Sequence, residues 1–214
     1  MAVLGVDGCP GGWVGALVGS GGISWHAGSL SELLTLPAAV VAVDIPLGLP
    51  SGANRRTCDV SAAARLGVQR SSVFPAPPRA VLAARDHVEA SVLSRAAGSV
   101  GVSLQTWNIV PKIREADGLR DPRLLEVHPE LSFRELSGQV LPRKKLLAGK
   151  LARQAALQAW RSVELPSTRP GRAAPDDCLD ALACAWTAQR WLRGEAEVLG
   201  GERDGTGQVM RIVI

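Results

Sequence analysis

The sequence predicts an α/β fold in which helices flank one mixed β-sheet of antiparallel and parallel strands. The first 27 residues consist of three short apolar runs separated by glycine-rich turns, which is typical of an antiparallel β-meander. A further apolar run, Ala38–Val43, follows a predicted helix, and a strand–helix–strand crossover favours parallel pairing. Near the end, Pro175–Leu192 has apolar residues at the i, i+3, i+4 and i+7 spacing of a helix with one buried face.

The meander begins with Ala2–Val6, a continuously apolar run that suits a central strand covered on both faces. Residues 8–12 are rich in glycine and force a reversal, after which Trp13–Val18 and Ile23–Ala27 form the second and third strands. Asp7 follows the first run directly. A carboxylate is costly to bury at such a position unless it is paired or binds a cation.

A capping box, Ser29 with Glu32, predicts a short helix between the meander and the next strand. That strand, Ala38–Val43, ends in Asp44, just as the first strand ends in Asp7. The carboxyl ends of parallel strands meet at one edge of a sheet, where open α/β sheets bind their ligands. We therefore expect the two carboxylates to lie together.

Residues 51–123 are the least regular part of the chain and are too long for an ordinary connection. We expect two helices here, Asp59–Leu66 and Arg79–Ala97, and a polar loop at Leu104–Ile113. The region is interpreted as an insertion within a single domain that spans residues 1–214.

Regular structure resumes with a strand at Leu124–Val127, which contains Glu126. A helix then begins at Pro129 and ends at Gly138. The basic segment after it leads into another helix that ends near Trp160, one side of which is formed by Leu147, Leu151, Ala155 and Gln158. The tail, Gln208–Ile214, alternates in polarity and is predicted as an edge strand, which could pair with a second copy to form a homodimer.

Four segments of the chain supply acids that could form one metal centre: Asp7, Asp44, Glu126, and the pair Asp177 and Asp180, which share a helix face. Carboxylate clusters are the ligands that Mg²⁺ and Mn²⁺ prefer. Two such ions about 4 Å apart can activate water and stabilise the leaving oxygen of a phosphodiester. We interpret Asp7 as the bridging ligand, Asp44, Asp177 and Asp180 as further metal ligands, and Glu126 as a fifth ligand or a residue behind the ligands. Asp176 is interpreted as a helix N-cap.

Composition narrows the class of protein. With 46% hydrophobic residues and no run of 18 apolar residues, the chain can bury a core, and no membrane span is expected. The N-terminus lacks the basic segment of a signal peptide, which favours the cytoplasm. The four cysteines have no metal-site spacing and are interpreted as packed thiols. A formal net charge of +4 is compatible with nucleic acid as a partner but does not require it.

Six motifs in order along the chain resemble the DUF429 family: GVDGCPGGW, DIPLGLP, SSVFPAPPR, WNIVPKI, EVHPE and DDCLDALACAWTA. The last of them is also similar to the final-helix acids of RuvC-type Holliday-junction resolvases. Because DUF429 proteins are described as predicted RNase H-like nucleases, the resemblance implies an RNase H-like fold and a metal-dependent nuclease of nucleic acid. Glu126 departs from that pattern, because it lies on a later strand than the usual second or third acid.

Several polar residues are candidates for contact with the substrate, some of them through the family motifs: Arg79, Trp107, Asn108, Lys112, His128, Lys144 and Lys145. Trp107 could stack on a base. His128 could assist protonation or orient the substrate, but packing before Pro129 is the favoured interpretation. The basic run at residues 143–150 could contact phosphates or could form a solvated face.

Two other functions stay open at this point. The chain could be a non-catalytic RNase H-like module that binds nucleic acid or protein. It could also be an ATP-dependent phosphotransferase of the actin/sugar-kinase type, in which Gly8, Gly11 and Gly12 would cradle a phosphate. A kinase of that type needs two such domains, and this chain has the length of one.

Overall fold

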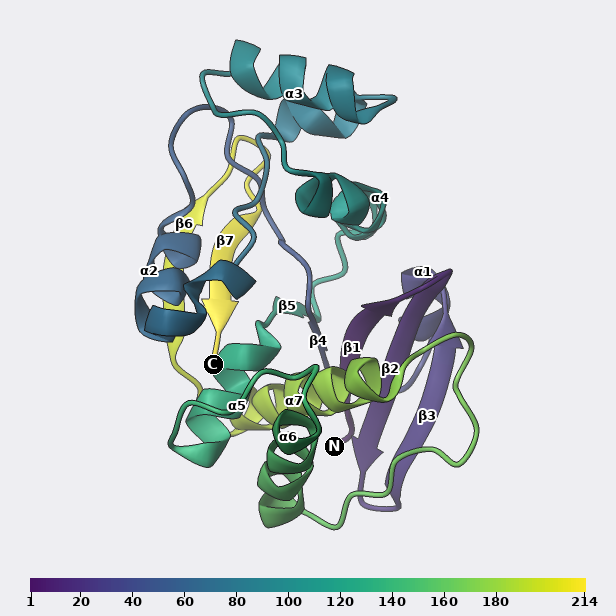
Figure 1. Ribbon diagram of the computed structural model, residues 1–214. Coiled ribbons are helices and arrows are strands. Elements are labelled where there is room, and N and C mark those ends of the chain that lie inside the picture. Colours follow the sequence, from purple (N-terminus) through teal and green to yellow (C-terminus); the bar gives the residue numbers. More distant parts are fainter. The chain divides into compact units, whose positions relative to one another are not determined.

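The computed structural model describes residues 1–214, which divide into two compact units (Figure 1). Unit 1 consists of Met1–Asp44, Asp121–Glu197 and Val213–Ile214. Unit 2 consists of Ile45–Arg120 and Val198–Ile212. The interpretation of residues 51–123 as an insertion into a single domain stays a prediction.

Unit 1 is built on a five-stranded mixed sheet in the order β3-β2-β1-β4-β5. The strands are β1 Val3–Cys9, β2 Gly12–Gly19, β3 Gly22–Gly28, β4 Val40–Val43 and β5 Leu124–Glu126. The first three strands pair in antiparallel fashion, whereas β4 is parallel to both β1 and β5. This arrangement confirms the predicted α/β class, a β-meander extended by parallel strands.

Four helices complete unit 1: α1 Leu30–Leu33, α5 Pro129–Ser137, α6 Leu147–Trp160 and α7 Pro175–Arg193. The predicted capping box of Ser29 and Glu32 starts α1, and Gly138, in the left-handed conformation, ends α5. Helix α7 packs across β1, β2 and β4 (Figure 1). The core of unit 1 lies between this helix and the sheet, with Ala42 and Leu125 on the sheet side and Leu182 on the helix side.

Two details of unit 1 differ from the predictions. Strand β1 continues through Asp7 to Cys9, because it pairs with β2 as far as the Cys9–Gly12 hairpin. On α6, Leu147 and Leu151 are 72% and 56% exposed, whereas Arg153 and Leu157 are buried. The side formed by Leu147, Leu151, Ala155 and Gln158 therefore faces solvent, and the opposite side packs inward with Arg153, which hydrogen-bonds to the carbonyls of Pro142 and Gly149.

Unit 2 contains three helices: α2 Thr57–Leu66, α3 His87–Ala96 and α4 Leu104–Leu119. It also contains two 3₁₀ turns, Gly67–Ser72 and Arg79–Ala83. Its two-stranded sheet is formed by β6 Val198–Arg203 and β7 Val209–Val213. The predicted helix Arg79–Ala97 is interrupted at Asp86, whose side chain caps α3 by accepting the Glu89 N–H. The predicted loop at Leu104–Ile113 is instead the first part of α4, which tolerates Pro111 in its interior. No helix of the protein has both the length and the apolar character that a membrane span requires.

Candidate functional site

Strands β1 and β4 bring Asp7 and Asp44 to the same edge of the sheet. Val6 pairs with Val43 in the parallel register, so the two acids follow paired residues. The Asp44 N–H continues the ladder by donating to the Val6 carbonyl over 3.0 Å. Residues in register on neighbouring strands have side chains on the same face, so both carboxylates lie on one face.

That face is the one covered by α7. A Cβ built on Gly5 would meet the backbone of Ala181, which shows that Gly5, and therefore Asp7 two residues later, faces the helix. Glu126 pairs with Val43 rather than with Ala42, so its side chain points to the opposite face of the sheet, where it is buried. The alternation of strand side chains separates Glu126 from the other predicted acids.

Helix α7 presents three acids at its N-terminal end, where the helix dipole favours negative charge. Asp180 is 2% exposed, and its Oδ1 is buried without a hydrogen-bond partner. The Asp177 Oδ2 accepts the Ala174 N–H over 2.8 Å, so Asp177 caps the helix from its first turn. The interpretation of Asp176 as the N-cap was wrong, because Ala174 occupies that position and Asp176 pairs with Lys145 instead.

The acids of β1, β4 and α7 act on one another electrostatically. Burial raises the pKa of Asp7 well above its usual value, and the charges of Asp180 and Asp44 raise it further. Burial likewise raises the pKa of Asp44. Burial raises the pKa of Asp180 to about 6, although the Lys144 ammonium opposes that shift. These three carboxylates therefore resist being ionised together, and a cation among them would relieve the repulsion.

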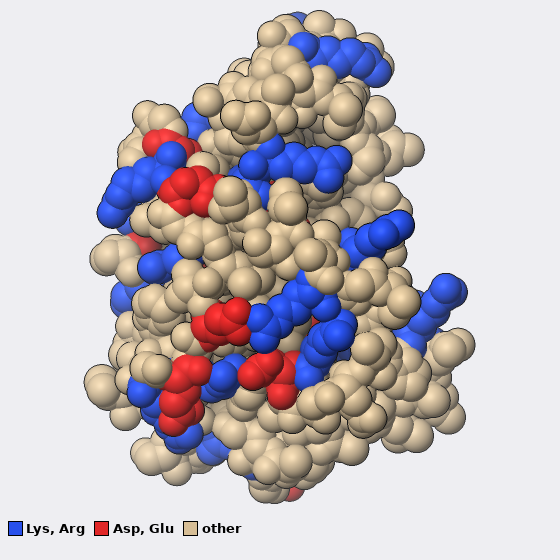
Figure 2. Space-filling model, turned by 90° about the vertical axis from the view of Figure 1, so that its left-hand side faces the viewer, with Lys and Arg blue, Asp and Glu red and all other residues tan.

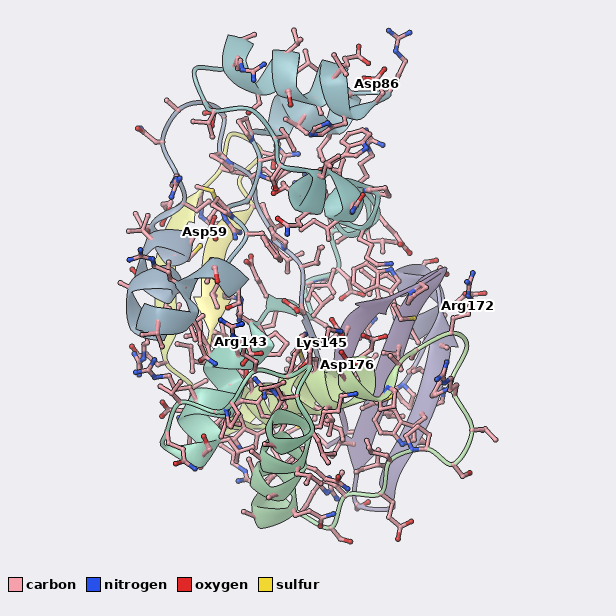
Figure 3. The ribbon with its side chains drawn as sticks, in the orientation of Figure 1. Asp59, Asp86, Arg143, Lys145, Arg172 and Asp176 are labelled. Atoms are coloured by element: carbon pink, nitrogen blue, oxygen red, sulfur yellow. The ribbon has the colours of Figure 1, made fainter.

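Lys144 contributes a positive charge to this group. Its Nζ lies 2.7 Å from Asp180 Oδ2. Burial alone would lower the Lys144 pKa, but the charges of Asp180, Asp7 and Asp44 raise it. The next residue, Lys145, donates to Asp176 over 2.8 Å, and Figure 3 shows both of these side chains at the N-terminal end of α7. We call Asp7, Asp44, Asp177, Asp180 and Lys144 the acidic centre.

Glu130 is an acid near this centre that the sequence analysis did not assign to it. It lies in the first turn of α5, and its charge raises the pKa of both Asp44 and Asp180. Both of its carboxylate oxygens accept from Arg153 Nη2, over 2.8 and 2.6 Å. The available signal was Pro129 at the start of a helix directly after β5, which puts the next acid at the same edge of the sheet.

The side chains of the acidic centre fit a divalent cation by their chemistry. All the acidic donors are carboxylate oxygens, which Mg²⁺ and Mn²⁺ prefer, and Asp180 Oδ1 has no other partner. No group of three or more His, Cys, Asp or Glu side chains is already arranged to hold a metal ion. The Lys144 ammonium contacts Asp180 instead, so an incoming ion would share the centre with it.

Among the predicted substrate-contacting residues of unit 1, Lys144 and Lys145 are both engaged in ion pairs with α7. His128, the N-cap residue of α5, is close enough to Asp44 to lower the pKa of that carboxyl against the effect of burial. The structure thus brings all three residues near the acids.

The other predicted substrate-contacting residues belong to unit 2. Arg79 is held by Asp117, over 2.7 and 2.9 Å, and by Asp204, over 2.6 Å, which indicates a structural tether. Trp107 lies on α4 and is half-buried, with its ring centroid 6.5 Å from that of His87. Asn108, on the same helix, is exposed, whereas Lys112 is half-buried.

The fold and the site define an α/β protein whose mixed sheet carries a buried carboxylate cluster beneath a covering helix. The chain belongs to the DUF429 family: the family's sequence model, described as "Protein of unknown function (DUF429)", matches residues 5–205. This match confirms the resemblance carried by the six motifs. Comparison with curated proteins found no match, and comparison with solved structures found none either.

Proposed function

We propose that this protein is a metal-dependent nuclease, which hydrolyses phosphodiester bonds of nucleic acid at the acidic centre. One observation carries the proposal. Two buried carboxylates, Asp7 on β1 and Asp180 on α7, lie close to the half-buried Asp44 that follows β4. The charges of Asp180 and Asp44 raise the pKa of Asp7, the charge of Asp44 raises that of Asp180, and the buried Oδ1 of Asp180 lacks a hydrogen-bond partner. Such groups are costly in a fold unless they have a function that uses them.

In this proposal Asp7, Asp44 and Asp180 hold Mg²⁺ or Mn²⁺, and Asp177 lies beside them as a further ligand. When bound, such an ion activates a water molecule and stabilises charge on the leaving oxygen. Asp177 also fixes where α7 begins, because it accepts the Ala174 N–H, and this sets the position of Asp180 one turn later. Glu130, held by Arg153, adds negative charge without being free to move.

The net charge of +4 is compatible with a polyanionic substrate but does not require one. Unit 2 has twelve Lys and Arg against seven Asp and Glu, whereas unit 1 has twelve against thirteen. The basic excess of the chain therefore belongs to unit 2. On the face shown in Figure 2, however, basic and acidic side chains lie beside one another rather than in a field of one sign. We therefore expect contacts to individual phosphates rather than broad electrostatic attraction.

We also place the protein in the cytoplasm. All four cysteines are free and buried. Burial raises the pKa of Cys178 to about 12, and the nearby charge of Asp177 adds to the effect, so this thiol is a poor nucleophile. Unreactive reduced thiols are typical of a reducing compartment.

The test combines cleavage and metal binding. End-labelled RNA and DNA, single-stranded, duplex and branched, are incubated with the protein in Mn²⁺, Mg²⁺ or EDTA. We expect Mn²⁺-dependent cleavage that the double variant Asp7→Asn/Asp180→Asn loses and that Glu164→Gln, a change at an exposed acid of unit 1, retains. Nucleic-acid binding that is equal in wild type and the double variant, with no cleavage of any substrate, would instead identify a binding module.

A further inference from the structure

We infer that Lys144 takes the place of a second metal ion, so that the acidic centre binds one divalent ion rather than two. The inference rests on the proposed metal centre and deepens it. The sequence alone led us to expect two ions, because the number of acids is sufficient for both. The structure adds a cation that belongs to the protein itself.

Lys144 is less exposed than its neighbour Lys145 and contacts a different acid of α7. Its side chain is 39% exposed, against 79% for Lys145, although both make ion pairs with α7. Its Nζ contacts Asp180 Oδ2 and also experiences the charges of Asp7 and Asp44. Asp180 therefore uses one oxygen for the ammonium and has the other, Oδ1, left for an ion.

The turn that carries Lys144 is held in place from both ends. Arg153, 1% exposed, donates to the carbonyl of Pro142 over 2.8 Å and to that of Gly149 over 3.0 Å. The Leu146 N–H closes the turn on the Arg143 carbonyl over 3.0 Å. Gly149 packs so closely that a Cβ there would lie 2.1 Å from the Arg143 oxygen. Lys144 is thus a positioned cation and not a freely moving surface lysine.

Counting charges favours one ion. Asp7 and Asp180 are buried and Asp44 is half-buried, and these three carry three negative charges when ionised, of which the ammonium compensates one. A single divalent ion compensates the other two. The charge of Asp177 is already compensated in part, because its carboxylate accepts the Ala174 N–H at the positive end of the α7 dipole. A second divalent ion would leave uncompensated positive charge beside the Lys144 ammonium and the buried carboxylates Asp7 and Asp180, and burial makes such an imbalance expensive.

The experiment is a calorimetric titration of MnCl₂ into the full chain, as wild type, Lys144→Met and Lys145→Met. Methionine keeps the length of the side chain and removes its charge. Lys145→Met is the matched control, because it breaks the neighbouring ion pair to the same helix. Thermal unfolding of each variant in EDTA and in Mn²⁺ reports folding, and Lys144→Arg tests whether a positive charge alone restores the wild-type stoichiometry.

We expect one ion per chain in wild type and Lys145→Met, and in Lys144→Met either a second ion or at least tenfold tighter binding. Lys144→Met should be less stable than wild type in EDTA and should gain more stability from Mn²⁺. Two ions in every variant would overturn the inference and leave the proposed metal centre intact. One ion of equal affinity in every variant would also overturn it, and no ion in any variant would overturn the proposed function as well.

Discussion

Gly5 of β1 lies directly against the backbone of Ala181 in α7. A Cβ at residue 5 would stand 1.9 Å from the Ala181 carbonyl oxygen and 2.2 Å from the Ala185 nitrogen. No side chain fits in that space, so this contact sets how closely helix and sheet approach each other. Asp7 follows Gly5 on the same face, and Asp180 directly precedes Ala181, so the same contact determines how near the two carboxylates come.

We expect Gly5→Ala to lower the free energy of unfolding by about 3 kcal/mol, because rigid backbone atoms on both sides must separate. Gly21→Ala, in the turn between β2 and β3, is the matched control, since nothing lies within 4 Å of a Cβ there. Urea unfolding followed by tryptophan fluorescence measures both. Equal midpoints for Gly5→Ala and wild type would show that α7 can move away from β1 at little cost.

Asp180 should make the metal-free protein less stable as the pH rises. Burial raises its folded pKa to about 6, whereas an unfolded aspartate titrates near 3.8, so the folded state binds more protons between these values. The free energy of unfolding in EDTA should therefore fall from pH 4 to pH 7, relative to Asp180→Asn, by on the order of 2–3 kcal/mol. Chemical unfolding at several pH values tests this, with Glu164→Gln expected to parallel wild type. A constant difference between wild type and Asp180→Asn across that range would contradict the prediction.

The two glutamates around β5 should differ in their effect on metal binding. Glu130→Gln removes a charge that acts on Asp44 and Asp180, so Mn²⁺ affinity should fall by about tenfold. Glu126→Gln changes a side chain on the opposite face of the sheet and should leave the affinity unchanged. Titration calorimetry compares the two. The reverse order of effects would mean that Glu126, as the sequence alone suggested, is a ligand.

Asp204 should contribute strongly to the stability of unit 2. It accepts the N–H groups of Leu49, Thr206 and Gln208 and pairs with Arg79. Burial alone would raise the pKa of Asp204, but these bonds hold it well below its usual value. The stabilisation that the ionised Asp204 gives the folded state is therefore present above about pH 4 and is lost as the pH falls.

We expect Asp204→Asn to cost about 3 kcal/mol at pH 7 and less at pH 3. Thr206→Val, which removes one hydroxyl bond to the same carboxylate, should cost about 1 kcal/mol. Thermal and urea unfolding of the three proteins measure these losses. A cost for Asp204→Asn that does not change with pH would show that the charge of Asp204 contributes nothing.

Local signals in the sequence predicted much of unit 1. The capping box at Ser29, the left-handed Gly138 and the apolar spacing of α7 each act within a few residues, so they can be read without knowing the fold. The convergence of Asp7 and Asp44 also followed from the sequence, because parallel strands with one crossover must end at the same edge. Unit 2 was harder to predict: α4 contains Pro111, and β6 has no apolar alternation that marks it as a strand.

The sequence by itself determined the class of fold, the family and the set of acids available to a metal. Only the tertiary structure decided which of those acids meet. Register and alternation turn Glu126 to the far face of the sheet, and the first turn of α5 brings Glu130 near the centre instead. The turn fixed by Arg153 carries Lys144 to Asp180, 36 residues away along the chain. Side-chain direction and long-range ion pairs depend on the packing of distant segments, and no local pattern of residues specifies them.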